Sequence, residues 1–301
     1  MKAIDLFAGA GGFSTGARMA GVDVVWAANH WQAAVDTHSV NHPEADHACQ
    51  DLHQADWSKV PKHDILLASP ACQGHSKARG KDRPHHDATR STAWAVVGCA
   101  EVHRPRVAVV ENVPEFLKWS LFPAWRTAME ALGYAVNPHV LDAADFGVPQ
   151  HRRRVFILCT RGGKAIDLEI RKRKHIPARD IIQPGVTRWS DISRLCQRTQ
   201  DRVAEGRRVH GKRFLVAYYG NEKGGRSLDR PIGTITTRDR YAIVEDDRLR
   251  MLTVEEYRRG MGFPDTYVLP KNRRLATHML GNAVCPPVAA EVISACKESI
   301  S

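Results

Sequence analysis

Short apolar runs alternate with segments of helical composition along the first 160 residues. The apolar runs predict buried strands at residues 2–7, 22–27, 64–68, 107–110 and 155–159. The stretches between them predict helices at residues 13–20, 32–39, 93–102 and 123–132. Continuous apolar strands that alternate with helices are typical of a mostly parallel sheet covered on both faces. The pattern therefore predicts an α/β, doubly wound fold, with residues 155–159 as the final strand of the sheet.

The pattern changes after residue 163. Residues 164–250 are poor in long apolar runs and are broken by Pro and Gly, with a short strand expected at 213–219. Helical patterning resumes at about residue 252, with a helix expected at 277–295. The simplest organisation is a first domain at 1–163, a smaller inserted domain at 164–250, and a C-terminal segment at 251–301 that returns to the first domain.

Positive charge is concentrated in the inserted domain. The chain of 301 residues has a net charge of +11, and residues 161–250 hold 22 Lys and Arg against 12 Asp and Glu. The rest of the chain holds 22 against 21, so the excess is local. Such an excess suits a polyanionic partner, of which nucleic acid is the leading candidate. A well-solvated basic surface is the alternative.

Composition narrows the class of protein. A hydrophobic content of 43% with 26% charged residues is ordinary for a globular protein and unlike a disordered one. No apolar run approaches the roughly 20 residues that span a bilayer, and the amino terminus lacks the pattern of a signal peptide. Seven cysteines without a C-x-x-C pair argue against a disulfide framework or a zinc ribbon. A cytoplasmic protein without a metal site is predicted.

Candidate cofactor residues follow the predicted strands. In a parallel α/β sheet, ligands bind at the carboxyl ends of the strands. Residues 7–12, Phe-Ala-Gly-Ala-Gly-Gly, follow the first strand and permit a tight turn close to a cofactor. A purely structural glycine turn is an equal alternative, and a P-loop is excluded because no Gly-Lys-Ser/Thr follows. Asn29, His30 and Trp31 follow the second strand, and Asp51 follows the next, which is the usual layout for an adenosine cofactor.

Candidate catalytic residues follow two further strands. Cys72 lies in the segment Ser-Pro-Ala-Cys-Gln-Gly-His-Ser after the strand at 64–68, and Glu111 follows the strand at 107–110. Residues 150–154, Gln-His-Arg-Arg-Arg, precede the last strand. A buried structural thiol and a solvated arginine turn are the alternatives for these groups taken singly. Together, a thiolate nucleophile, a carboxyl acid and guanidinium groups suit a pyrimidine, which thiolate addition activates at the neighbouring ring carbon.

With these residues in order, the chain resembles the cytosine-5 DNA methyltransferases. The resemblance covers about residues 1–160 and 250–301. It is carried by six motifs in the family's order: residues 5–13, 69–73, 111–113, 150–154, 250–265 and 281–284. It implies the Rossmann-like fold of S-adenosylmethionine-dependent methyltransferases, with S-adenosyl-L-methionine as methyl donor and S-adenosyl-L-homocysteine as product. It also implies double-stranded DNA as the partner and a target cytosine swung out of the duplex.

The resemblance assigns roles to individual residues. Cys72 would attack C6, Glu111 would hold and protonate N3, Arg154 would support the base carbonyl, and Arg152 would lie near the cytosine or the backbone. Cofactor contacts are implied for Phe7, Ala8, Gly9, Gly11, Gly12, Asn29, His30, Trp31, Asp51, Leu52, Ser69, Pro70, Asn282 and Ala283. DNA contacts are implied for Gln73, Ser76, Lys77 and Arg79. The basic segment 164–250 takes the place of the target-recognition domain.

This chain departs from the family pattern at two positions. Ala71 stands before the catalytic cysteine where the family usually has Pro, and His30 stands where it usually has Glu. A tRNA cytosine methyltransferase, which shares the catalytic motifs, and a catalytically idle DNA-binding relative are the alternative functions. A nicotinamide-dependent oxidoreductase shares the layered architecture but gives no role to the catalytic set. A cognate restriction endonuclease and a monomeric chain are further expectations.

Overall fold

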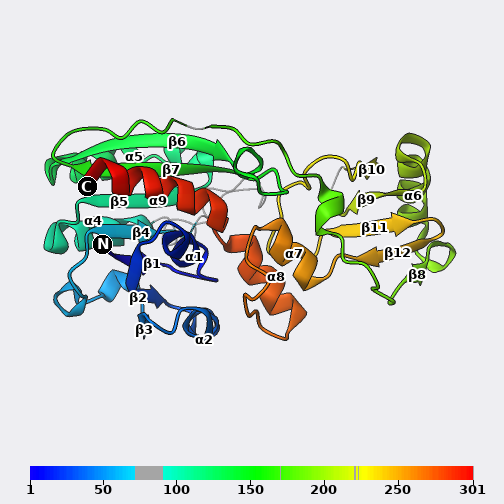
Figure 1. Ribbon diagram of the computed structural model, residues 1–301, viewed down its shortest axis with the longest axis horizontal. Coiled ribbons are helices and arrows are strands. Elements are labelled where there is room, and N and C mark those ends of the chain that lie inside the picture. Colours follow the sequence, from blue (N-terminus) through cyan, green and yellow to red (C-terminus); the bar gives the residue numbers. More distant parts are fainter. Residues whose placement is uncertain (72–90, 170, 220–221, 223, 301) are drawn as a thin grey trace.

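The computed structural model describes residues 1–71, 91–169, 171–219, 222 and 224–300. They form a large and a small sheet, with helices α7 and α8 between them (Figure 1). The large sheet has the order β3-β2-β1-β4-β5-β7-β6. Its strands are β1 (Lys2–Leu6), β2 (Asp23–Asn29), β3 (Asp46–Cys49), β4 (Ile65–Ala68), β5 (Val107–Asn112), β6 (Tyr134–Asp142) and β7 (Arg153–Arg161). β7 is antiparallel to both of its neighbours, and the pairs between β3 and β5 are parallel.

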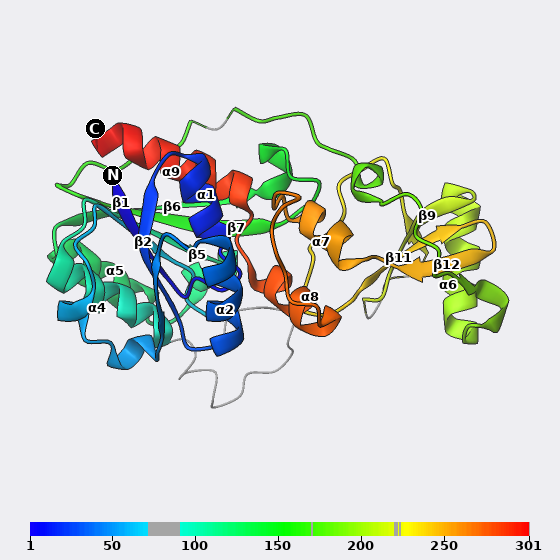
Figure 2. The ribbon, with the colours of Figure 1, turned by 60° about the horizontal axis from the view of Figure 1, so that its bottom comes forward.

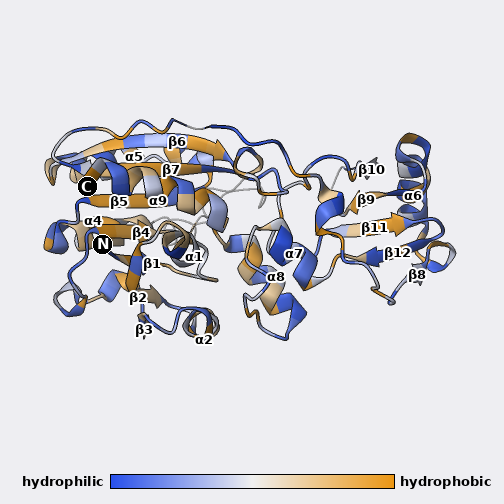
Figure 3. Ribbon diagram, viewed as in Figure 1, coloured by the Kyte–Doolittle hydropathy of each residue, from blue (hydrophilic) through white to orange (hydrophobic). Residues whose placement is uncertain are grey.

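Helices cover both faces of the large sheet. They are α1 (Gly12–Met19), α2 (Gln32–Asn41), α4 (Trp94–His103), α5 (Phe122–Ala131) and α9 (Pro286–Ile300). Successive strand residues enter different cores: Leu67 shares a core with residues of α1 and α9, and Leu66 shares one with residues of α4 and α5. Strands buried on both faces are apolar along their length, as β4 and β5 are in Figure 3. The predicted doubly wound, mostly parallel sheet is confirmed.

The end of the large sheet differs from the prediction. The strand expected at 155–159 exists, but it is β7, and it lies between β5 and the edge strand β6. β6 was not predicted because it contains Pro138 and only three of its nine residues are buried. An edge strand half open to solvent carries no continuous apolar run, so the sequence pattern does not mark it.

The small sheet is built from residues between 190 and 251. Its order is β10-β9-β11-β12-β8, and all of its pairs are antiparallel. The strands are β8 (Ser190–Asp191), β9 (Arg213–Ala217), β10 (Gly225–Arg226), β11 (Tyr241–Glu245) and β12 (Arg248–Met251). Helix α6 (Gln197–His210) packs Val203 into a small core with Phe214 and Val244. The opposite face of this sheet joins the core of the large sheet through α7.

The C-terminal segment returns to the large sheet. It contains α7 (Val254–Gly260), α8 (Arg273–Asn282) and α9, which packs along α1 (Figures 1 and 2). The stretch Arg273–Ile300 passes the length and hydropathy criteria for a membrane span. It is divided into two helices, however, and 67% of its apolar window is buried inside the protein. It therefore packs as core helices, and the helix expected at 277–295 is interrupted between Asn282 and Pro286.

Candidate functional site

The loops after β1, β2, β3 and β4 meet at one edge of the large sheet. The backbone N–H of Ala8 donates to the carbonyl of Ala28 at 3.0 Å, and that of Ser69 donates to Leu6 at 3.1 Å. The N–H of Gln50 donates to the carbonyl of Asn29 at 3.1 Å. These bonds bring the predicted cofactor segments together at the carboxyl edge, where a parallel sheet binds its ligands.

The glycine loop is held in an unusual backbone conformation. Phe7, Gly9 and Gly11 have φ angles of 61°, 55° and 72°, and the N–H of Gly11 donates to the carbonyl of Ala8 at 2.8 Å. A β-carbon on Gly12 would lie 2.1 Å from the carbonyl oxygen of Val284. Glycine at position 12 therefore permits direct contact between the first cofactor motif and the last one, although they are separated by almost the whole chain.

The other predicted cofactor residues lie around this loop. Trp31 is half-buried, with its ring edge-on to His278 at a centroid distance of 5.5 Å. Asn29 is buried, and its side-chain oxygen accepts from the N–H of Trp31 at 3.0 Å. His30 is exposed at the end of β2.

Asp51, Leu52, Asn282 and Ala283 complete the predicted cofactor set. The exposed Asp51 carboxylate accepts from the N–H of His53 at 3.0 Å, and the next residue, Leu52, is buried. Asn282 is exposed beside His278, at 3.2 Å between side-chain nitrogens, and Ala283 is buried. The loop after β3 and the end of α8 thus each present one polar side chain to solvent next to a buried apolar one.

The start of the catalytic loop is tied to β5. The side-chain amide of Asn112 donates to the carbonyl of Pro70 at 3.1 Å, and its oxygen accepts from the N–H of Val113 at 2.8 Å. Asn112 was not predicted as a site residue, although its place directly after Glu111 in the 111–113 motif could have indicated it. Cys72 and the predicted DNA contacts Gln73, Ser76, Lys77 and Arg79 lie outside the described residues.

A buried carboxyl and a guanidinium face each other at the ends of β5 and β7. Glu111 is 6% exposed, and its Oε1 lies 3.3 Å from Nε of Arg154. Burial raises the pKa of Glu111, and the nearby guanidinium groups of Arg154 and Arg152 only partly oppose this. A carboxyl group with a raised pKa can keep its proton and donate it to a ring nitrogen.

Arg152 lies close to this pair, directly before β7. Expected beside the cytosine or the backbone, it is buried, and its guanidinium donates to the backbone carbonyls of Ile235, Gly281 and Ala283 at 2.9–3.1 Å. It lies near enough to favour the ionised form of Glu111. These hydrogen bonds to backbone carbonyls tie segments of the fold together.

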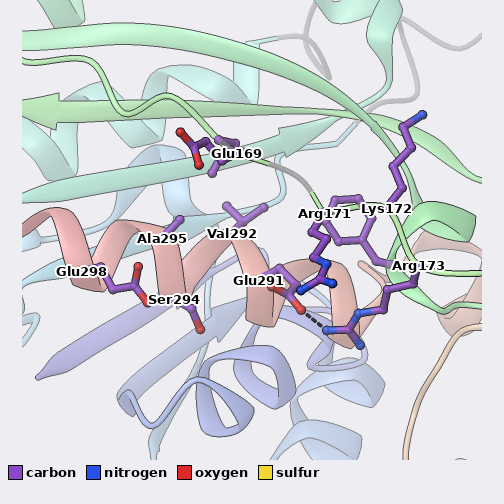
Figure 4. A pocket seen from close by; sticks show the side chains of 11 residues that line it. Glu169, Arg171, Lys172, Arg173, Glu291, Val292, Ser294, Ala295 and Glu298 are labelled. Carbon is purple, nitrogen blue, oxygen red and sulfur yellow. Dashed lines mark hydrogen bonds and ion pairs between the residues drawn. The ribbon is translucent and has the colours of Figure 1, made fainter.

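A surface cavity lies away from these residues. It has a volume of about 590 Å³ and is lined by α9 and by Leu168, Glu169, Arg171, Lys172 and Arg173 (Figure 4). An ion pair between Arg173 and Glu291 crosses its rim. None of the predicted site residues lines this cavity. In the part of the chain that the structure describes, no cluster of three His, Cys, Asp or Glu side chains is arranged to hold a metal ion.

Comparison with known proteins agrees with the geometry. The C-5 cytosine-specific DNA methylase family matches residues 1–212 and 171–298. The chain belongs to this family. The type II methyltransferase M.NlaX of Neisseria lactamica is 30% identical over 313 aligned positions, covering 100% of this chain and 97% of that protein. M.HhaI of Haemophilus parahaemolyticus is 25% identical, with coverages of 94% and 90%. M.AgeI of Thalassovita gelatinovora is 36% identical over 178 positions, which are 41% of its length.

Solved structures share the fold at lower identity. A protein described as a DNA modification methyltransferase encoded within an E. coli prophage superposes with a TM-score of 0.77 at 19% identity, covering 100% and 99% of the two chains. A mutant DNMT2 of Spodoptera frugiperda superposes with a TM-score of 0.74 at 18% identity and covers 98% of each. Family membership makes the chain an S-adenosylmethionine-dependent DNA (cytosine-5-)-methyltransferase, and the predicted fold, enzyme class and family are confirmed.

Proposed function

We propose that this methyltransferase acts on a cytosine swung out of double-stranded DNA at a specific sequence, through a covalent bond between Cys72 and C6. The observation that carries the proposal is the pair of buried Glu111 and half-buried Arg154, 3.3 Å apart at the strand ends. Asn112, next in the chain to Glu111, holds the segment that leads to Cys72. A flipped base at this edge of the sheet would meet the nucleophile, the acid and the guanidinium from neighbouring loops.

The proposed reaction assigns a role to each of the three side chains, Cys72, Glu111 and Arg154. The Cys72 thiolate adds to C6 while Glu111 donates a proton to N3, so the ring carries no net negative charge and C5 becomes nucleophilic. S-adenosylmethionine, when bound, supplies the methyl group. C5 then loses its proton to a base, elimination of the thiolate from C6 restores the aromatic ring, and N3 returns its proton to Glu111, which frees the enzyme. Arg154 donates to the base carbonyl and holds the Glu111 side chain in place.

The residues around the glycine loop fit an adenosine cofactor. Among the described residues, a β-carbon on Gly9 would meet only the Phe7 carbonyl, at 3.7 Å, so these residues leave space beside the loop. Trp31 offers an aromatic face for adenine, and the exposed Asp51 offers an acceptor for its amino group. Asn282 would lie at the methionine end. We propose these residues, with the others of the predicted cofactor set, as the S-adenosylmethionine site.

We further propose that residues 164–250 are the target-recognition domain. Exposed arginines there would mostly contact phosphate, which positions the protein without reading sequence. The named relatives are type II methyltransferases, which favours a cognate restriction endonuclease as a partner in the cell. We also propose that the enzyme is a monomer that acts on DNA in the cytoplasm.

The test is a Cys72→Ser variant assayed beside the wild type on duplex DNA and on total tRNA. The wild type is expected to methylate DNA and to form an irreversible adduct with DNA carrying 5-fluorocytosine, because fluorine blocks the final elimination. The variant is expected to do neither, since an alcohol is a far poorer nucleophile than a thiolate. An undiminished adduct in the variant would contradict the role of Cys72, and methylation of tRNA alone would contradict the DNA substrate. Bisulfite sequencing of DNA from expressing cells would give the target sequence.

A further inference from the structure

One buried guanidinium connects the small sheet with the cofactor edge of the large sheet. Arg152 is 3% exposed and lies directly before β7. Its Nη1 donates to the carbonyl of Ile235 at 3.1 Å, in the segment that leads into β11 of the small sheet. Its Nη2 donates to the carbonyls of Gly281 and Ala283, at 3.0 and 2.9 Å, on either side of Asn282. A single rigid group therefore fixes the distance between two segments.

The segment before Ile235 is also joined to the large sheet by its backbone. Ile232 exchanges two hydrogen bonds with the chain beside Arg152: its N–H donates to Pro149 at 2.9 Å, and its carbonyl accepts from His151 at 2.8 Å. The hydroxyl of Thr234 donates to the His151 carbonyl at 2.8 Å. Gln150, fully buried, accepts from the N–H of Ile235 at 2.7 Å and donates to the Gly260 carbonyl in α7 at 3.0 Å.

The same segment touches the end of α8 backbone to backbone. A β-carbon on Gly281 would lie 2.3 Å from both the carbonyl carbon of Thr236 and the nitrogen of Thr237. Because close-packed backbones cannot be compressed, a displacement of residues 235–237 must move the end of α8. That end carries Asn282, the proposed cofactor contact, and leads to Val284, which packs against the glycine loop.

We propose that Arg152 is a positioning residue. It couples DNA binding by the inserted domain, residues 164–250, to cofactor binding at the turn formed by residues 281–284. The proposal rests on the proposed function, since it assigns DNA to one segment and cofactor to the other. When DNA fixes the position of residues 235–237, the Arg152 guanidinium fixes the position of the 281–284 turn as well. Each ligand therefore tightens the binding of the other. Linkage requires the effect to be equal in both directions, and couplings of this kind are typically about 5- to 150-fold.

The test measures binding and not turnover. S-adenosylhomocysteine is titrated calorimetrically into the enzyme alone and into the enzyme saturated with duplex DNA containing the target site. The wild type is expected to bind it at least about 5-fold more tightly with DNA than without. In Arg152→Met this ratio should fall close to one, while binding without DNA changes much less. Arg152→Lys, which keeps a donor but loses the fork, should retain an intermediate ratio.

A matched control and a milder variant complete the design. Arg153→Met removes the same charge from the neighbouring exposed arginine, and its ratio should equal that of the wild type. Thr234→Val removes the hydrogen bond from the Thr234 hydroxyl to the His151 carbonyl and leaves the Arg152 guanidinium in place. It should lower the ratio even if Arg152→Met fails to fold.

Two outcomes overturn the inference. In the first, the wild type binds S-adenosylhomocysteine equally well with and without DNA. In the second, Arg152→Lys, Thr234→Val and any folded Arg152→Met all keep the ratio of the wild type. Failure of the wild type to methylate DNA would instead contradict the proposed function, because the binding ratio is measured without turnover.

Discussion

Replacement of Asp5 by Asn should stabilise the protein at neutral and alkaline pH. Asp5 is fully buried in β1, two residues before the first residue of the cofactor loop, Phe7. Its Oδ2 accepts from the hydroxyl of Ser14 at 2.7 Å, and its Oδ1 has no hydrogen-bond partner among the described residues. Burial raises the pKa of this carboxyl from 3.8 to about 7, although the hydrogen bonds from Ser14 oppose the increase. The charge is therefore unfavourable in the folded state.

The magnitude follows from linkage. A folded-state pKa above the unfolded one means that the folded state holds a proton more tightly, so stability is lost as pH rises from about 4 to about 7. Each pKa unit corresponds to about 1.4 kcal/mol, which gives about 4 kcal/mol as the upper limit of the loss. An amide has the shape of a protonated carboxyl and cannot ionise. The advantage of Asp5→Asn over the wild type should therefore grow through this pH range and level off above it.

The assay is urea unfolding of both proteins at several pH values between 4 and 9. The buried His38 and His42 also affect stability in this range, because burial lowers their pKa values and stability falls as pH drops below about 6.5. His38 lies 2.9 Å from Ser14, the hydrogen-bond partner of Asp5, so the two proteins are compared mainly above pH 6.5, where both histidines are neutral. Asp23→Asn, at an exposed position of β2, is the control and should follow the wild type. Parallel curves for Asp5→Asn and the wild type would refute a burial penalty at Asp5.

Three further predictions concern the site. Gly12→Ala should destabilise the protein by about 1–3 kcal/mol and weaken cofactor binding, because its methyl group would overlap the Val284 carbonyl. Thermal unfolding measures the stability and calorimetry the cofactor affinity; no change in either would contradict the close contact. Arg154→Met should lower kcat/KM about 100- to 1000-fold. It should also move the alkaline limb of the pH profile upward, since loss of a nearby cation raises the pKa of Glu111 further; an unmoved limb would contradict Glu111 as the proton donor. His30→Glu should tighten S-adenosylmethionine binding roughly 10- to 150-fold, as one hydrogen bond to a charged acceptor contributes about 1.5–3 kcal/mol; weaker binding in calorimetry would contradict a ribose contact.

Much of the large sheet could be predicted from the sequence because its information is local. Strands such as β4 and β5 are apolar at every position outside their polar ends, since helices cover both faces. The glycine loop and the 111–113 motif each consist of consecutive residues. The chemistry of each can therefore be recognised without knowledge of the fold. The topology rule for parallel sheets then places the ends of these strands at one edge. For these reasons the predicted cofactor segments and Glu111 are found together.

The tertiary structure alone decided what Arg152 does. The carbonyls that it binds are 83, 129 and 131 residues away along the chain, and its own segment of three consecutive arginines does not indicate which of them is buried. The same holds for His38, whose ring nitrogens lie 2.7 Å from His47 and 2.9 Å from Ser14 in a buried network that no sequence pattern indicates.

The place of β6 and the role of Arg152 share one physical reason. The edge strand β6 is specified by its pairing with β7 and not by its own apolar pattern, since six of its nine residues are only partly buried or exposed. A buried polar side chain is specified by partners that only folding brings within hydrogen-bonding distance. The sequence by itself determined the strands that are buried on both faces and the motifs that are read as contiguous residues. The tertiary structure decided every property that depends on contacts between distant segments, because those contacts leave no periodic pattern along the chain.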